Sequence, residues 1–184
     1  MVSWYNTAMN YEELKIVPQV DSAVVCCFTG NRPHKLPWRE FESDERCKKI
    51  KSKLKKAVLE LAQNGARLFI CGMAQGADTF FAEIVLEIRK TYPQIKLECA
   101  LPFLSQAKSW GEKEQARYKK ILEQADYITV VSEYPSRYAP LKRNRYMVEK
   151  SSVLLSVNYD ETGGSAYTER IAHEKGLKII KIIE

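Results

Sequence analysis

The sequence predicts an α/β fold, a three-layer sandwich built around a mostly parallel sheet of about six strands. Short apolar runs alternate along the chain with longer segments of helical periodicity, an order typical of parallel strands joined by crossover helices. The apolar runs are hydrophobic throughout rather than at every second residue, so both faces of each strand need cover. Because 184 residues suit one domain with a short addition, we expect an N-terminal extension over residues 1–22 and one domain over residues 23–184.

Six apolar runs have the length and composition of buried strands. They are rich in Val, Ile, Leu, Phe and Cys, and Pro102 ends the third of them. In chain order the expected strands are Ala23–Thr29, Arg67–Cys71, Lys96–Leu101, Tyr127–Ser132, Val153–Tyr159 and Leu177–Ile183.

Five longer segments between these runs show the periodicity of helices. In the second of them, Phe81, Val85 and Ile88 share one face, and Gly65 and Gly176 suit the C-caps of the first and last. In chain order the expected helices are Asp44–Asn64, Asp78–Thr91, Glu112–Gln124, Lys142–Lys150 and Ser165–Lys175.

The chain is mildly basic, with 29 Lys and Arg against 23 Asp and Glu and a net charge of +6. Seven of the basic residues fall within Arg46–Lys56. The apolar residues of this segment, such as Ile50 and Leu54, lie on one helical stripe, which leaves the lysines in water. A solvated helix face is the favoured interpretation, and a nucleic-acid patch is the alternative.

Several classes of protein are disfavoured by composition. No apolar run approaches the ~18 residues of a membrane span, and residues 1–10 lack the pattern of a secretory signal, so we expect a cytoplasmic protein without a membrane partner. Five cysteines without a C-x-x-C pair argue against a disulfide framework or a zinc knuckle. His34 and His173 lack metal-ligand spacing, which argues against a metal site built on them and leaves a site of oxygen ligands alone as the alternative. We expect no metal and no cofactor.

The residues that follow the predicted strands carry the strongest functional signal. In an open parallel sheet, ligands bind beyond the carboxyl ends of the strands. Five loops rich in glycine, arginine, asparagine and hydroxyl groups follow strands here, whereas the opposite rim carries ordinary turns. The candidate ligand-binding residues of these loops are Gly30, Asn31, Arg32, Pro33, Gly72, Met73, Ala74, Gly76, Ala77, Asp78, Pro102, Trp110, Arg143, Asn144, Gly163, Gly164, Ser165 and Thr168.

Two of these loops suit a phosphate. G-M-A-Q-G-A-D (72–78) follows a strand and opens a helix, and G-G-S-A-Y-T (163–168) has the same design. Small residues let backbone N–H groups approach an anion, and a helix N-terminus adds a favourable field. Alternatively, Asp78 and Ser165 only cap their helices. In the phosphate interpretation, Gly76 lies where the backbone comes closest to the ligand.

Charged and aromatic residues near the same rim could complete the site. Arg32 and Arg143 supply planar donors for a phosphate or a carboxylate, or else form ordinary surface ion pairs. Trp110, Tyr118 and Tyr138 could stack on a base, although aromatic residues at helical spacing more often belong to the core.

Taken together, the segments F-T-G-N-R-P-H-K-L-P-W, F-I-C-G-M-A-Q-G-A-D, R-N-R-Y-M-V and G-G-S-A-Y-T resemble the SLOG superfamily, and most closely its YpsA-like branch, from about Val24 onward. The resemblance implies a Rossmann-like sheet and a pocket for a nucleotide or a nucleotide-derived ligand. Residue by residue, it points to Gly30, Arg32, Pro33, Gly72, Gly76, Asp78, Arg143, Asn144, Met147, Gly163, Gly164 and Thr168.

One departure from the superfamily concerns catalysis. Its LOG-type phosphoribohydrolases carry P-G-G-x-G-T-x-x-E, whereas this chain has T-G-G-S-A-Y-T-E, which places Glu169 one position early. One residue is a rotation of ~100° on a helix, enough to aim the carboxylate elsewhere.

These observations favour a non-catalytic protein that senses or sequesters a nucleotide or a nucleotide-derived ligand. One alternative is a phosphoribohydrolase-like enzyme that cuts nucleotide N-glycosides, in which Asp78 or Glu169 acts on water or on the transition state. Another is single-stranded nucleic-acid binding of the DprA type through the lysine-rich helix. The oligomeric state is left open, a homo-oligomer included.

Overall fold

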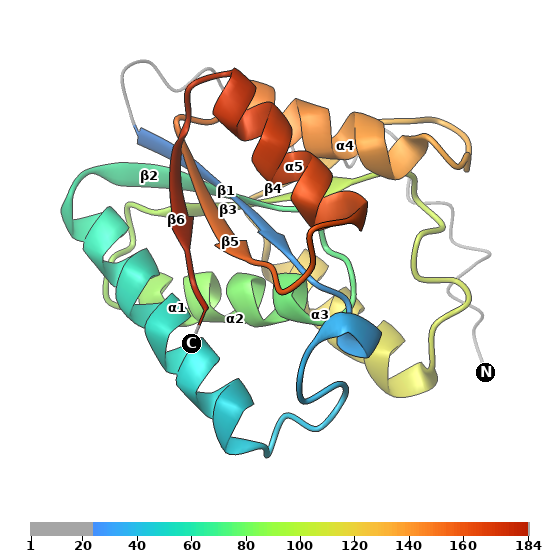
Figure 1. Cartoon of the computed structure of the whole chain (residues 1–184), viewed down its shortest axis with the longest axis horizontal. Helices are drawn as coiled ribbons and strands as arrows, with labels where there is room; N and C mark the ends of the chain where they lie inside the picture. Colours follow the sequence, from blue (N-terminus) through green and yellow to red (C-terminus); the bar gives the residue numbers. More distant parts are fainter. Residues whose placement is uncertain (1–23, 184) are drawn as a thin grey trace.

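The computed structural model describes residues 24–183, which form one six-stranded sheet with helices on both faces (Figure 1). All neighbouring strands are parallel, in the order β4-β3-β2-β1-β5-β6. The predicted three-layer α/β architecture is therefore confirmed, whereas the extension predicted over residues 1–22 lies outside the described residues. The strands are β1 (Val24–Gly30), β2 (Ala66–Cys71), β3 (Lys96–Leu101), β4 (Tyr127–Val130), β5 (Val153–Val157) and β6 (Lys178–Lys181).

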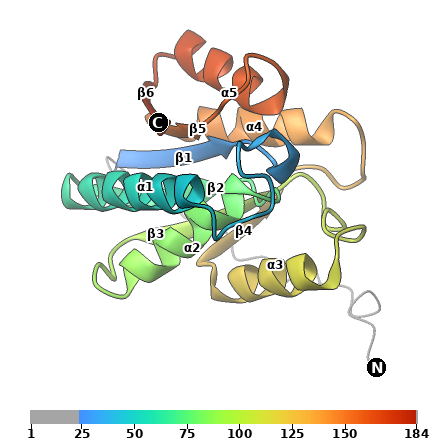
Figure 2. The same cartoon turned by 60° about the horizontal axis from the view of Figure 1, so that its bottom comes forward.

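The helices divide between the two faces of the sheet (Figures 1 and 2). On one face lie α1 (Glu45–Gln63), α2 (Ala77–Arg89) and α3 (Glu112–Gln124), and on the other lie α4 (Ala139–Glu149) and α5 (Gly163–Glu174). The chain moves outward from β1 to β4 and then returns to the far side of β1 for β5 and β6. The direction of winding thus reverses between β1 and β5, the place where doubly wound sheets open a crevice.

Each central strand contributes to two cores, which explains its unbroken apolar sequence. Cys26 and Phe28 of β1 pack on the side of α1 and α2, whereas Cys27 packs on the side of α4 and α5. The rings of Phe28 and Phe81 stack with centroids 4.6 Å apart. All five cysteines are buried free thiols, and burial raises the pKa of Cys27 to about 11. Within the described part of the chain, no helix is long and apolar enough to span a bilayer.

The basic segment forms the first helix, and its charges are largely compensated. Ile50 and Leu54 are buried beneath the helix, as the apolar stripe predicts. Five of the seven basic residues of this segment lie within 4 Å of a carboxylate, which weakens the positive field that a nucleic acid would meet. These pairs are Arg46–Asp44, Lys48–Glu45, Lys51–Glu42, Lys55–Glu87 and Lys56–Glu60.

Most bounds of the predicted elements agree with the structure to within two residues, and two features differ by more. A single-turn 3-10 helix, η2 (Pro33–Lys35), follows β1 and was not expected. In addition, α4 begins at Ala139, three residues before the predicted start at Lys142. Pro140 fits this first turn because the missing N–H of proline would have no helical acceptor there.

Candidate functional site

The loops after β1 and β5 are joined at the reversal of the sheet. Asn31 N donates to Val157 O at 3.0 Å. The buried side chain of Asn31 links the same two loops, since Oδ1 accepts from Tyr159 N at 2.7 Å and Nδ2 donates to Asn158 Oδ1 at 3.1 Å. The amide of Asn31 therefore fixes the relative position of these loops.

The loop after β2 packs directly on the loop after β1. Ala77 N donates to Asn31 O at 3.2 Å. Gly76 has φ +92°, and a Cβ there would lie 2.8 Å from Asn31 O and 2.9 Å from Pro33 Cδ. A Cβ at Gly30 would overlap that of Ala77. Both glycines thus permit close packing between loops, while the expected role of Gly76 as the nearest ligand contact stays a prediction.

Asp78 is a buried carboxyl group in the first turn of α2. The N-cap of this helix is Gly76, so the alternative in which Asp78 caps it is wrong. The carboxylate instead reaches back into the loop, where Oδ2 accepts from Ala74 N at 3.0 Å. Burial raises the pKa of Asp78 to about 6, although the charge of Arg143 acts in the opposite direction.

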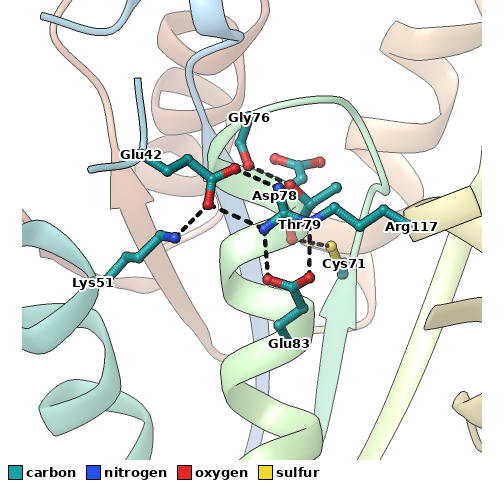
Figure 3. A network of polar contacts seen from close by, with 8 residues as sticks. All are labelled: Glu42, Lys51, Cys71, Gly76, Asp78, Thr79, Glu83 and Arg117. Carbon is teal, nitrogen blue, oxygen red and sulfur yellow. Dashed lines mark hydrogen bonds and ion pairs between the residues drawn. The ribbon is translucent and has the colours of Figure 1, made fainter. Parts of the chain in front are cut away.

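A cluster of ion pairs lies beside the N-terminal half of α2 and links it to α1 and α3 (Figure 3). Arg117 of α3 contacts Glu83 of α2 at 2.6 Å and Glu42 at 2.5 Å, and Lys51 of α1 also contacts Glu42 at 2.5 Å. Burial alone would lower the pKa of Arg117 and raise that of Glu42, but these contacts outweigh it, so the pKa of Arg117 is raised and that of Glu42 is lowered. The cluster holds three helices together beside the loop after β2 and was not predicted, because its members are far apart in sequence.

Arg143 connects the two glycine loops. Its buried guanidinium donates from Nη1 to Gly72 O, at the end of β2. Its Nε donates to Asn144 Oδ1 at 2.8 Å, and Asn144 Nδ2 donates to Gly164 O at 3.3 Å. Burial lowers the pKa of Arg143. The chain of contacts runs from the loop after β2 to the first turn of α5.

The first turn of α5 is open to solvent. Gly163 and Gly164 are exposed, no acidic residue lies in this turn, and the N-cap Thr162 makes no side-chain hydrogen bond to the helix. Ser165 lies inside the helix, so the alternative in which Ser165 caps it is wrong. Thr168 Oγ1 donates to Gly164 O at 2.7 Å. The first N–H groups of this helix therefore face the site without an intrahelical acceptor.

Three residues of this region were missed by sequence reasoning. Lys35 Nζ lies 2.5 Å from Asp160 Oδ2 and 3.0 Å from the position that a Cβ of Gly163 would take. Asn158 Oδ1 also accepts from Asp160 N at 3.2 Å. Asp160 directly follows the predicted fifth strand, and this position on the rim was the signal for it. Asn158 fell inside the predicted strand Val153–Tyr159, whereas β5 ends at Val157 in the structure.

The remaining predicted residues lie at the margins of the site. Arg32 is exposed just before η2, and Pro102 is buried directly after β3. Trp110 is half-buried and packs edge-on against the buried Tyr118, with ring centroids 5.2 Å apart. Met147 is buried within the core beneath α4 and α5. Core packing accounts for the positions of the Trp110, Tyr118 and Met147 side chains. For the two aromatic residues, this is the alternative to base stacking that the sequence left open.

The structure directs Glu169 away from the glycine loops. Ser156 Oγ donates to Glu169 Oε1 at 2.6 Å, and Lys181 Nζ pairs with Oε2 at 3.0 Å. Glu169 lines an open groove of about 710 Å³ between α5, β6 and the loop after β5, and the other predicted site residues do not line it. Within residues 24–183, no three His, Cys, Asp or Glu side chains gather in a way that could hold a metal ion.

Comparison with known sequences gives a family match over most of the chain. The family model named YpsA, described as the YspA SLOG family, matches residues 26–180. A UPF0398 protein of Bacillus pumilus is 32% identical over 146 residues, which are 77% of this chain and 76% of that protein. A UPF0398 protein of Halalkalibacterium halodurans is 32% identical over 156 residues, covering 82% and 81% of the two chains.

Comparison with solved structures supports the fold. DNA processing protein A (DprA) of Streptococcus pneumoniae matches with a TM-score of 0.61 and 15% identity, over 86% of this chain and 50% of that one. DprA of Helicobacter pylori, described for its single-stranded DNA binding mode, matches with a TM-score of 0.59 and 20% identity. The match covers 88% of this chain and 66% of the Helicobacter chain, so both DprA chains extend well beyond the shared domain.

Proposed function

The chain belongs to the YspA SLOG family, and from this premise we propose that it binds a nucleotide or a nucleotide-derived ligand at the carboxyl ends of β1, β2 and β5. The phosphate of the ligand lies at the first turn of α5, and the sugar and base extend toward β2 and β3. The protein acts as a sensor or as a sequestering protein, so no residue is required to break a bond.

The single observation that carries this proposal is the open N-terminus of α5 at the point where the sheet reverses. Helix N-termini attract anions because free N–H groups and the helix dipole act in the same direction. Gly163 and Gly164 leave this terminus exposed, and the ammonium of Lys35, which is paired with Asp160, lies beside it. The combination fits a phosphate better than a neutral ligand.

The N-terminus of α2 is less suited to a phosphate. Asn31 O already accepts from Ala77 N at 3.2 Å, and Asp78 places an acidic group in the first turn. A hydroxyl or amino group of the ligand is a better neighbour for Asp78, because a carboxylate accepts hydrogen bonds from such donors. We therefore assign the phosphate to α5 and a donor-rich part of the ligand to α2.

A second function, hydrolysis of a nucleotide N-glycoside, is favoured by one observation. With a pKa of about 6, Asp78 is poised to exchange a proton near neutral pH, which suits general acid or base catalysis. Glu169 is less suited, because Ser156 and Lys181 hold both its oxygens. Release of free base from AMP, abolished in Asp78→Asn and retained in Glu169→Gln, would establish this alternative.

Single-stranded nucleic-acid binding through α1 is the least supported function. The single-stranded DNA binding mode belongs to the Helicobacter protein, which this chain resembles at 20% identity. Most basic side chains of α1 are paired with carboxylates, and such pairs leave little net charge to release counterions from a nucleic acid.

Mass spectrometry of small molecules released by heat from gently purified protein tests the proposal. We expect a phosphorylated nucleotide in near-stoichiometric amount, because a binder without turnover retains its ligand. If none is released, calorimetric titration with AMP, ADP and cyclic AMP follows. Failure of all three to bind, with no ligand released, would contradict the proposed function.

A further inference from the structure

The last strand of the sheet has an open backbone edge. Lys178 N donates to Ser152 O at 3.0 Å, and Ile182 N donates to Ser156 O at 2.7 Å, so these residues turn their polar backbone groups toward β5. In a strand, the N–H and C=O of one residue point to the same side, and the side alternates along the chain. Ile179 and Lys181 therefore turn theirs outward, where no further strand lies among the described residues.

The open edge coincides with the groove described above. Its floor is formed by Ile179, Lys181 and Ile183, and its wall by a stripe of α5 that includes Arg170 and His173. Figure 1 shows β6 at the outer edge of the sheet with α5 beside it. A volume of about 710 Å³ is enough for several side chains, so an incoming strand would find both backbone partners and room beside them.

The charges in the middle of the groove favour an acidic occupant. Three carboxylates line the groove, and two of them are paired within the chain, Asp160 with Lys35 and Glu169 with Lys181. The guanidinium of Arg170 instead lies over the ring of Tyr167, 5.4 Å from its centroid. Arg170 and His173 are exposed and stand on the same side of α5, which leaves two donors for a carboxylate. The exposed acid Glu161 lies at the far end, in the loop after β5.

A second copy of this chain is a poor occupant. Antiparallel pairing must set the outward-facing residues of the two β6 strands opposite one another, so Lys181 of one copy lies in the same short ladder as Lys181 of the other. The register centred on Lys181 places these like charges directly opposite, which is destabilising. Each copy also carries a net charge of +6. Edge lysines are a common defence against such self-pairing, yet they leave pairing with an acidic segment favourable.

We propose that β6 and the adjacent groove form a docking site for an extended acidic segment of a partner protein. The segment adds to the sheet as a further strand, and its main chain forms hydrogen bonds with the backbone of Ile179 and Lys181. Its carboxylates contact Arg170 and His173. The groove adjoins the nucleotide site proposed above, since Asn158 and Asp160 line it, but the docking contacts of Ile179, Lys181, Arg170 and His173 do not depend on a nucleotide.

A synthetic peptide that alternates valine and glutamate, labelled with fluorescein, serves as the probe. We expect saturable binding to the full chain, and none for the peptide that alternates valine and lysine. Arg170→Glu should weaken binding at least about tenfold, since it turns an attraction into a repulsion. The matched control Lys120→Glu makes the same charge change on the exposed surface of α3, at the opposite end of the sheet, and should change affinity less than about twofold.

Hydrogen exchange measured by NMR on the wild-type chain identifies the backbone contacts without any substitution. The peptide should slow exchange at the amides of Ile179 and Lys181 and leave Ile180, which faces β5, unchanged. Absence of binding, equal losses in Arg170→Glu and Lys120→Glu, or binding without slower exchange at Ile179 and Lys181 would overturn the proposal. Sedimentation showing a dimer that the peptide dissociates would also overturn it and assign the edge to a second copy.

Discussion

The guanidinium of Arg143 occupies the space that a side chain at Gly72 would need. Arg143 comes from α4 and Gly72 from the end of β2, and the two are joined by a hydrogen bond from Nη1 to the glycine carbonyl. A Cβ at Gly72 would overlap Nη1. Because Gly72 has no side chain, the charged guanidinium of Arg143 can be buried against it. The hydrogen bond between them fixes α4 to the carboxyl end of β2.

Substitutions at these two positions should not be additive. Gly72→Ala displaces the guanidinium and should cost about 1–3 kcal/mol of unfolding free energy, by overpacking. Arg143→Ala leaves the carbonyl of Gly72 and the amide of Asn144 without their donor and should cost about 2–4 kcal/mol. In the double variant the added methyl group enters the space that the guanidinium has left. Its loss of unfolding free energy in urea denaturation should therefore be at least about 1 kcal/mol smaller than the sum of the two single losses.

The control for this cycle is Gly65→Ala, whose Cβ meets no atom within 4 Å. Its cost should add to that of Arg143→Ala within about 0.5 kcal/mol. Additivity of Gly72→Ala and Arg143→Ala as well would show that the two residues do not compete for one space.

Gly76→Ala should destabilise the fold more than Gly65→Ala. Both glycines have a positive φ, +92° and +95°, so alanine meets backbone strain at each, and the ψ of −125° takes Gly76 outside the left-handed helical region. At Gly76 the new Cβ would also lie 2.8 Å from Asn31 O and 2.9 Å from Pro33 Cδ, whereas at Gly65 it enters open space. We expect Gly76→Ala to lose at least about 1 kcal/mol more in urea denaturation, and equal losses would contradict the packing of the two loops.

Asp78 should make folding less favourable as pH rises. Its pKa is raised from 3.8 to about 6 by burial, so the folded state binds the proton more tightly than the unfolded chain does. The stabilising contribution of the protonated form is complete below about pH 4 and is lost as pH rises through about 6. Relative to Asp78→Asn, the wild type should lose on the order of 3 kcal/mol across this window.

Unfolding free energies measured from pH 4 to pH 7 for both proteins check this expectation. A difference between them that stays constant over the range, or that moves in favour of the wild type as pH rises, would show that Asp78 is not buried as described.

The order of strands and helices was predictable because each element carries its own local signal. The apolar run before Thr29 and the stripe of Phe81, Val85 and Ile88 need no knowledge of distant residues. The rim could be predicted for the same reason, since parallel strands place all their carboxyl ends together. The early start of α4 was missed although Pro140 carried a signal for it.

The contacts within the site could not be predicted, because they join residues from different elements. Arg143 was expected to meet a phosphate or a carboxylate, or else to form a surface ion pair, and no local signal indicated its hydrogen bond to Gly72 O, a partner 71 residues away. Its contact with a ligand stays a prediction. Glu169 contacts Ser156 and Lys181, which come from β5 and β6, and no sequence motif links these three residues. Periodicity indicates which face of an element is buried, but it does not identify the side chain across from it.

The most direct test of the proposed site compares two substitutions at Gly164. Gly164 does not have a positive φ, and a Cβ there would lie 3.8 Å from Asn144 Nδ2, so both alanine and aspartate fit. The negative charge of an aspartate in the first turn interacts favourably with the helix dipole, so Gly164→Asp should still fold. Its carboxylate nevertheless competes with a phosphate for the same N–H groups. Gly164→Ala adds the same Cβ without the charge and serves as the matched control.

Calorimetric titration of both variants with the nucleotide recovered from the purified protein is the decisive measurement. We predict that Gly164→Ala binds within about threefold of the wild type, and that Gly164→Asp binds at least about tenfold more weakly, a loss of about 1.4 kcal/mol. The corresponding nucleoside, which lacks the phosphate, should not distinguish the two variants. Equal affinity of Gly164→Asp and Gly164→Ala for the nucleotide would contradict a phosphate at the N-terminus of α5.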